Sequence, residues 1–214
     1  MEHIDLFLYI NLEKRSDRDK HMKKLLLDDL KIPPKKVVRI DAIYADPPFR
    51  GCTKSHLLAL MTVIKAAHCK FICILEDDFT LTTDVLTFQN RVASAWKMLN
   101  EDFDVVFLAC TPIRLEHTSE KRFFRVKQAL AMPGMIVHQR YFEKLKKIYE
   151  QALNEKKPHD LITQMYQPKD KWYVFWPPIG CQAPGYSDIE QRVVNYAYLD
   201  VQGQMIVDKQ KLKY

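Results

Sequence analysis

Three consecutive acids follow an apolar run, and their types and spacing could support chemistry directly. Glu76, Asp77 and Asp78 come immediately after the five apolar residues 71–75. A short unbroken apolar run is typical of a strand buried on both faces, as in parallel sheets. Three like charges at the end of such a strand repel one another, and partial desolvation would increase the cost. We therefore expect a positive group beside them.

A divalent cation is one positive group that would fit. Mg²⁺ and Mn²⁺ prefer carboxylate oxygens and keep coordination positions open for water and phosphate. In extended backbone, residues i and i+2 project to the same side, so Glu76 and Asp78 could hold one ion while Asp77 faces a neighbour. Such an ion would neutralise a diphosphate leaving group. The alternative interpretation is an exposed acidic loop, which is common after a strand.

Two arginines just past the first apolar run are the other charged candidates. Arg15 and Arg18 could bind phosphate through their guanidinium groups. They could equally form the solvated basic start of a helix, beside Asp17 and Asp19. The sequence leaves both interpretations open.

The elements that must position these residues alternate between strand and helix. Strands are expected over 4–12, 36–44, 71–75 and 103–110, with 128–137 a strand or turn. Helices are expected over 13–30, 52–69, 84–100 and 140–153, with a short one near Asp160. This alternation predicts an α/β fold with a mostly parallel sheet flanked by helices. Ligands of such folds bind at the C-terminal edges of strands, where residues 13–18 and 76–78 would both lie.

Several local details complete the prediction. Ser16 or Asp17 could cap the first helix. Residues 46–51 are expected to form a loop in which Gly51 supplies a special backbone angle. In the following helix the expected apolar stripe is Leu57, Leu60, Met61 and Ile64. His56 could donate to a ligand or satisfy a backbone carbonyl, and the charged stretch 111–125 is expected to be a loop.

Composition narrows the class of protein. The chain has 214 residues, 47% of them hydrophobic and 28% charged, which suits one globular domain. The net charge of +6 is spread along the chain among acids, which argues against a nucleic-acid partner. Five scattered cysteines without zinc-type spacing, no signal peptide and no apolar run near 20 residues predict a cytoplasmic protein. Any membrane contact would then be peripheral, and the oligomeric state is open.

Segments along most of the chain, taken in order, resemble glycosyltransferase family 25, the lipopolysaccharide and procollagen galactosyltransferase type. The resemblance covers about residues 4–195. Its segments are INLEKRSDRDKHM (10–22), VVRIDAI (37–43), GCTKSHLLAL (51–60), ILEDDF (74–79), FDVVFLAC (103–110), KPHD (157–160) and GYSDI (185–189). The chain is closer in length to compact bacterial or virus-encoded members than to the longer collagen-directed ones.

The resemblance implies a GT-A fold, a Rossmann-type sheet in a single glycosyltransferase domain over 1–214. The donor-binding part would be about 1–110, the acceptor and closing part about 111–200, and the tail 201–214. It also implies a nucleotide-sugar donor, with UDP-hexose the default, Mn²⁺ or Mg²⁺ as cofactor, and transfer with inversion. The acceptor, a hydroxyl on a glycan, lipid-linked glycan or protein, stays open.

The same resemblance assigns roles to individual residues. The nucleotide end would be formed by Asn11, Arg15 and Arg18. The donor pocket would be lined or braced by Gly51, Ser55 and His56, and closed by Gln182, Ser187 and Asp188. Glu76 and Asp78 would hold the metal, with Asp77 in the same diphosphate site. The catalytic base would be Asp160 in the first place or Asp188 in the second, although Asp160 could instead be a helix cap.

Two classes of function remain open after this comparison. One is an active metal-dependent sugar transferase. The other is a catalytically degenerate transferase fold that serves as a sugar-nucleotide-binding or scaffold module. The retained acid triplet favours the first, because a non-catalytic protein has little use for clustered like charges.

Overall fold

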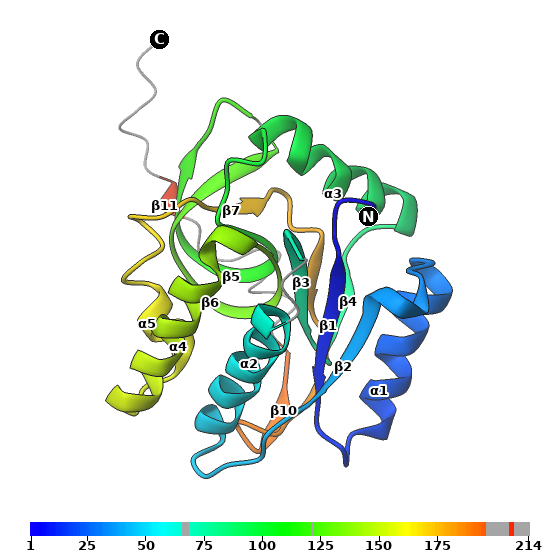
Figure 1. Cartoon of the computed structure of the whole chain (residues 1–214), viewed down its shortest axis with the longest axis vertical. Helices are drawn as coiled ribbons and strands as arrows, with labels where there is room; N and C mark the ends of the chain where they lie inside the picture. Colours follow the sequence, from blue (N-terminus) through cyan, green and yellow to red (C-terminus); the bar gives the residue numbers. More distant parts are fainter. Residues whose placement is uncertain (66–68, 121, 196–205, 208–214) are drawn as a thin grey trace.

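The computed structural model describes residues 1–65, 69–120, 122–195 and 206–207. In these residues one large sheet has the strand order β11-β5-β7-β6-β3-β1-β2. Every adjacent pair in it is parallel except those made by β6, which is antiparallel to β3, β5 and β7. The prediction of a single α/β domain with a mostly parallel sheet is therefore confirmed (Figure 1).

The elements follow in chain order. The strands of the large sheet are β1 (Leu6–Asn11), β2 (Val37–Asp41), β3 (Phe71–Glu76), β5 (Val105–His117), β6 (Phe123–His138), β7 (Trp172–Phe175) and β11 (Ile206–Val207). Two small two-stranded sheets pair β4 (Phe79–Leu81) with β8 (Gly180–Gln182) and β9 (Gly185–Ser187) with β10 (Arg192–Val194). The α-helices are α1 (Ser16–Lys23), α2 (Pro48–Lys65), α3 (Val85–Leu99), α4 (Phe142–Glu155) and α5 (His159–Thr163).

Alternation along the central strands divides the core into two layers. In β1, Leu8 and Ile10 face one layer while Phe7 and Tyr9 face the other. The first layer packs against α2, α4 and α5, and the second packs against α1 and α3. Figure 1 shows α2 and α4 on one side of the sheet and α1 on the other. Burial on both faces explains the unbroken apolar runs in the sequence.

The expectation of a loop over 111–125 is wrong. Strand β5 continues to His117 and β6 begins at Phe123, so the two form a long antiparallel hairpin. Charged residues misled the prediction because they alternate with buried ones, as they do in a half-exposed hairpin. Glu116 on one strand forms an ion pair of 2.7 Å with Lys127 on the other, which stabilises the pairing.

Several local expectations also fail. Helix α2 begins at Pro48, so Gly51 lies in a helix and has no special backbone angle. Its buried side includes Ala59, Leu60 and Val63, whereas Met61 is exposed, so the predicted apolar stripe is rotated. Neither Ser16 nor Asp17 caps α1, which begins after Arg15 without a side-chain cap. The helix continues beyond α1 as a single wider π-helical stretch over Lys24–Asp29.

The described helices do not include one that is long and apolar enough to cross a bilayer. The expected tail 201–214 lies outside the described residues except for β11. The last residues of the predicted helix 52–69 fall partly outside them as well.

Candidate active site

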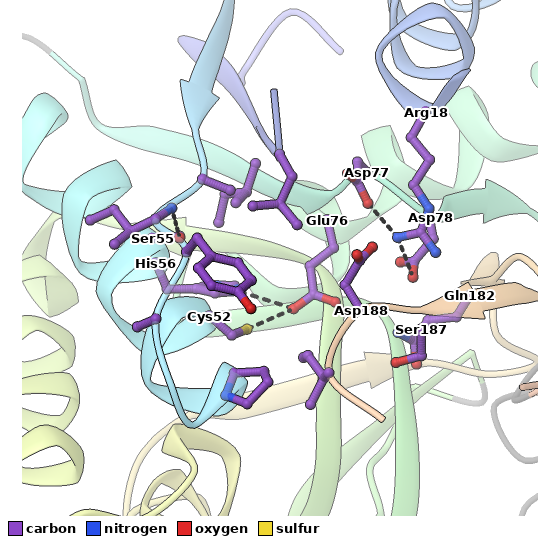
Figure 2. Close-up of a pocket in the computed structure, with 18 residues that line it drawn as sticks. Arg18, Cys52, Ser55, His56, Glu76, Asp77, Asp78, Gln182, Ser187 and Asp188 are labelled. Atoms are coloured by element: carbon purple, nitrogen blue, oxygen red, sulfur yellow. Dashed lines mark hydrogen bonds and ion pairs between the residues drawn. The ribbon is translucent and has the colours of Figure 1, made fainter. Parts of the chain in front are cut away.

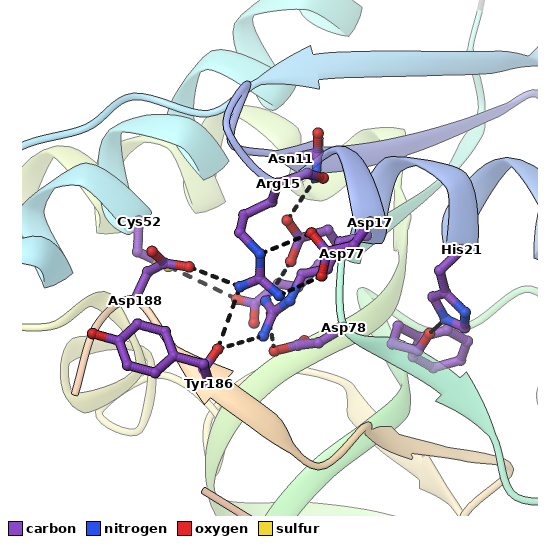
Figure 3. Close-up of polar contacts among 12 residues, drawn as sticks. Asn11, Arg15, Asp17, His21, Cys52, Asp77, Asp78, Tyr186 and Asp188 are labelled. Carbon is purple, nitrogen blue, oxygen red and sulfur yellow. Dashed lines mark hydrogen bonds and ion pairs between the residues drawn. The ribbon is translucent and has the colours of Figure 1, made fainter. Parts of the chain in front are cut away.

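The acids at the end of β3 meet the start of α1, because β1 and β3 are parallel neighbours whose C-terminal ends share one edge. Arg18 Nη1 lies 2.6 Å from Asp77 Oδ1 and 3.2 Å from Asp78 Oδ2. Asn11 at the end of β1 donates to Asp77 Oδ2 at 2.8 Å. The positive group expected beside the acids is thus Arg18 (Figure 2), and Asp77 does face neighbouring side chains such as Asn11 (Figure 3).

Asp78 has the features of a cation ligand. Burial and then the negative charge of Glu76 raise its pKa to about 7. Its Oδ1 atom is buried and has no hydrogen-bond partner among the described residues. A buried carboxylate oxygen without a donor is costly, and a divalent cation would satisfy it. The residues present therefore fit Mn²⁺ or Mg²⁺ at this position.

Glu76 contacts a different set of side chains. Its Oε1 atom lies 3.1 Å from His56 Nε2 and 3.8 Å from Cys52 Sγ, both on α2. Figure 2 shows Glu76 between this pair and the acids, with Asp188 nearby. Glu76 is therefore shared between an acidic side, which holds Asp77 and Asp78, and a Cys/His side on α2.

The Cys/His side was missed by sequence reasoning. Ligand atoms of Cys52, His56 and His159 lie within 4.8 Å of one another, a set of thiol and imidazole groups that Zn²⁺ would prefer. Thr53 Oγ1 donates to Phe49 O, so it accepts from His159 Nδ1 at 3.2 Å. Residue 159 is far from 52 and 56 in sequence, so no local spacing could have indicated this cluster.

Burial favours the neutral forms of Cys52 and His159. It raises the pKa of Cys52 well above its ordinary value, with Glu76 adding to the effect. It lowers the pKa of His159 well below its ordinary value, and His56 lowers it further. The side chain of Tyr149 is fully buried against both rings, and its hydroxyl has no hydrogen-bond partner among the described residues.

Ser55 and Gly51 shape the pocket wall. Ser55 Oγ donates to Gly51 O at 2.7 Å and accepts from Ile43 N at 2.8 Å. These bonds hold the segment after β2 against α2. A Cβ at position 51 would collide with the carbonyl oxygen of Ile43. The glycine is needed for this close approach and not for a backbone angle.

The C-terminal segment lies over the acids and is held by both arginines. Arg15 Nη1 pairs with Asp188 Oδ2 at 2.9 Å, and Lys14 pairs with Asp188 Oδ1 at 2.7 Å. Arg18 Nη2 also donates to the carbonyl oxygen of Tyr186 at 2.9 Å. Burial opposes ionisation of Asp188, but the hydrogen bonds from Lys14 and Arg15 prevail and lower its pKa.

Asp160 lies in the first turn of α5 and is not the helix cap, which is Pro158 without a side-chain cap bond. Its Oδ1 accepts from Leu161 N at 2.9 Å, and its Oδ2 accepts from Ala131 N at 3.4 Å. Burial raises its pKa, which its backbone hydrogen bonds partly oppose. A carboxylate with a raised pKa is better suited to accept a proton near neutral pH.

One pocket collects most of the predicted site residues. Those that line it are Arg18, Ser55, His56, Glu76, Asp77, Asp78, Gln182, Ser187 and Asp188. Asn11, Arg15 and Gly51 lie behind it and each contacts a lining residue. Asp160 is outside the lining, although its charge influences the pKa of lining Cys52. Apolar residues such as Ile43, Tyr44 and Ile189 complete the wall.

The strand order and the two helical layers define a GT-A-like α/β fold. The protein shares its fold with the crystal structure of a glycosyltransferase involved in the glycosylation of the major capsid of PBCV-1. The TM-score is 0.53 at 10% sequence identity, over 87% of this chain and 96% of that one.

Other comparisons are weaker. A197 from STIV aligns with a TM-score of 0.49 and 14% identity over 88% of this chain and 93% of that one. The mannose-1-phosphate geranyltransferase from Thermus thermophilus aligns with a TM-score of 0.49 and 11% identity, over 83% and 74%. No protein-family model matches the sequence, and no curated protein sequence matches it significantly.

Proposed function

We propose that the protein is a metal-dependent, inverting glycosyltransferase that moves a hexose from a UDP-linked donor to a hydroxyl acceptor. The observation that carries this proposal is Asp78, a buried carboxylate with an unpartnered oxygen beside Glu76 and Arg18, in a pocket at the sheet edge. This edge is where ligands of α/β folds bind.

Arg18 and Arg15 are the chain's own phosphate-binding groups in this proposal. Arg18 already faces the acids, and guanidinium groups form paired hydrogen bonds to phosphate oxygens. Arg15 and Arg18 also hold the segment around Tyr186 and Asp188. A diphosphate that replaced some of these contacts would keep the charge balance of the site.

Asp78 and Glu76 would hold Mn²⁺ or Mg²⁺, and Asn11 would keep Asp77 in place behind them. A cation bound there supplies charge neutralisation to the departing diphosphate. Gln182 and Ser187 would close the donor pocket from the C-terminal segment.

A carboxylate of the chain acts as the base that accepts the proton of the acceptor hydroxyl. The acceptor hydroxyl gives its proton to the base while its oxygen forms a bond to the sugar's anomeric carbon. The bond from that carbon to the diphosphate oxygen breaks, and the nucleoside diphosphate leaves. Asp160 is the first choice because its pKa is raised, whereas the pKa of Asp188 is lowered by its cationic partners.

The family-25 resemblance and the shared fold support the same class. The motifs around Arg15, Ser55 and Asp78 come together at one pocket, as a shared donor site requires. The PBCV-1 protein, whose fold this chain shares, is itself a glycosyltransferase. The rival is a degenerate binding module, which would bind the donor without turnover.

A panel of nucleotide sugars with purified protein, with and without Mn²⁺, tests the proposal. Release of nucleoside diphosphate in the presence of Mn²⁺ names the donor, and its loss in chelator shows metal dependence. Donor binding without any release, even with a broad set of acceptors, would favour the binding-module alternative. Full turnover in excess chelator would contradict the mechanism.

A further inference from the structure

A second pocket lies between the first half of α3 and the segment that follows β7. It is a depression of about 380 Å³, within the range of small-molecule sites. It is lined by Thr87, Asn90, Arg91, Arg122, Trp176 and Pro177. None of these residues lines the pocket that holds the acids. The six are basic, polar or apolar, and none is an acid.

Arg91 carries an unsatisfied charge in this pocket. Its Nη1 donates to Pro177 O at 2.7 Å, while its Nη2 is buried without a hydrogen-bond partner in the described part of the chain. Burial lowers the pKa of Arg91, and the nearby positive charge of Arg122 lowers it further. A half-buried guanidinium beside a like charge, with a donor left unpaired, is costly.

The surroundings fix this guanidinium and add further contacts. Its Cζ atom lies 5.7 Å from the centre of the Phe175 ring, and the bond to Pro177 holds one end. Asn90 offers an amide on the same face of α3 as Arg91, whereas the hydroxyl of Thr87 already donates to Asp84 Oδ2 at 2.6 Å. Trp176 provides an aromatic surface of the kind that packs against sugar rings.

We propose that this pocket binds the oxyanion of a phosphorylated ligand, with Arg91 and Arg122 as its two cationic partners. An oxyanion between the two guanidinium groups would balance both like charges. A phosphate ester on a sugar and the headgroup of an anionic lipid share this chemistry.

The second pocket is connected to the first by a short stretch of chain. Trp176 lines the second pocket, and Gln182, six positions later, lines the first. Six residues can span at most ~20 Å even when fully extended. The two linings thus come within the length of a phosphorylated glycan or lipid-linked glycan of a few units. Its assignment as the acceptor rests on the proposed transferase function, whereas anion binding does not.

Titration of the full chain with inorganic phosphate and with a monosaccharide phosphate tests the oxyanion site by calorimetry. The Arg122→Ala variant removes an exposed cation with little risk to folding, and we expect it to weaken binding by ~10-fold. The matched control is Lys97→Ala, which removes an exposed cation of α3 that does not line the pocket. It should bind phosphate like the wild type. Arg91→Lys keeps the positive charge but loses the planar set of guanidinium donors, so it should also weaken phosphate binding.

A donor-site variant separates the two pockets. In Asp78→Asn, phosphate binding that depends on Arg122 should persist. Equal affinities for the wild type, Arg122→Ala and Lys97→Ala would overturn the proposal, as would loss of phosphate binding in Asp78→Asn. If the protein binds phosphate through Arg122 but turns over no donor, the anion site stands. Its ligand is then not a transferase acceptor.

Sedimentation with vesicles distinguishes the sources of the oxyanion. Vesicles of phosphatidylglycerol and phosphatidylcholine are compared with vesicles of phosphatidylcholine alone. Sedimentation with the anionic vesicles that is lost in Arg122→Ala would identify a lipid-borne headgroup. Binding of the soluble sugar phosphate without vesicle binding would identify a soluble ligand. If the protein bound neither the anionic vesicles nor the sugar phosphate, the proposed oxyanion site would be wrong.

Discussion

The two sides of Glu76 differ in whether a cationic side chain lies beside their buried groups. On the Cys/His side, burial holds Cys52 and His159 in their neutral forms. On the acidic side, Asp77 and Asp78 are ion-paired with Arg18 at 2.6 and 3.2 Å. Burial also raises the pKa of Asp77 and Asp78, and Arg18 opposes this rise without cancelling it, so only the acidic side has a counter-charge for its carboxylates. We therefore place the cation and the diphosphate of the proposed reaction on the acidic side.

Among the variants considered, Asp78→Asn should cause the largest loss of turnover. Loss of one carboxylate ligand removes charge stabilisation of several kcal/mol, so turnover should fall by at least ~10³-fold. Steady-state kinetics at saturating Mn²⁺ measure the loss. Asp102→Asn, which changes an exposed acid paired with Lys171, is the matched control and should keep full activity. Comparable activity of the two variants would remove Asp78 from the mechanism.

The same variant should gain stability while it loses activity. Burial raises the pKa of Asp78 in the folded protein to about 7, well above the usual value for an aspartate. Protonated Asp78 therefore stabilises the fold at low pH, and this contribution is lost as pH rises through about 7. In chelator at pH 8, Asp78→Asn should have a higher free energy of unfolding than the wild type, by roughly 1–3 kcal/mol. Urea denaturation at pH 8 and pH 5 would test this, and an advantage that did not shrink at pH 5 would contradict it.

Asp160→Asn separates the base from the donor site. It should lower kcat by about 10²-fold or more while leaving the KM for the donor unchanged, because a base acts only in the chemical step. The acid limb of the wild-type pH profile should also lie above the range of an ordinary aspartate, since burial raises the pKa of Asp160. Asp188→Asn is the rival variant. A larger loss of kcat in Asp188→Asn than in Asp160→Asn would move the role of base to Asp188.

Arg18→Ala tests the cation that balances the acidic side. Charge-assisted hydrogen bonds to a diphosphate contribute about 1.5–3 kcal/mol, so donor affinity should fall by ~10-fold or more. Equilibrium titration with the nucleoside diphosphate in Mn²⁺ measures the change. Arg140→Ala removes a guanidinium paired with Asp102 and Asp104 and serves as the control. Unchanged affinity in Arg18→Ala would mean that the arginine only neutralises the acids.

Sequence reasoning could find the acidic side but not its counterpart. The acids, Arg15 and Arg18 follow strands directly, and strand ends of a parallel sheet meet at one edge, so local order predicts their meeting. Cys52 and His159 meet only because α2 packs beside α4 and α5 in one core layer, a contact that local spacing does not encode. The hairpin of β5 and β6 was missed for a related reason. Its charged residues, such as Glu116 and Lys127, gain their partners only from cross-strand pairing.

Glu76 contacts both sides. Substitutions of His56 test whether its contact with Glu76 supports Mn²⁺ binding. His56 is fully buried and contacts Glu76 Oε1 at 3.1 Å, so we treat it as a positioning residue for a metal ligand. Partners of this kind typically change metal affinity by about 10–100-fold when they are removed. His56→Leu should therefore weaken Mn²⁺ binding by ~10-fold.

His56→Gln supplies the control within the same position, because its amide can still donate to Glu76. It should restore most of the Mn²⁺ affinity that His56→Leu loses, whereas a purely structural role would affect the urea midpoint of both variants and the Mn²⁺ affinity of neither. Equal Mn²⁺ affinities for the wild type and both variants would assign Glu76 to the Cys/His side alone. Asp78 and its unpartnered oxygen would then be left as the protein's contribution to the metal.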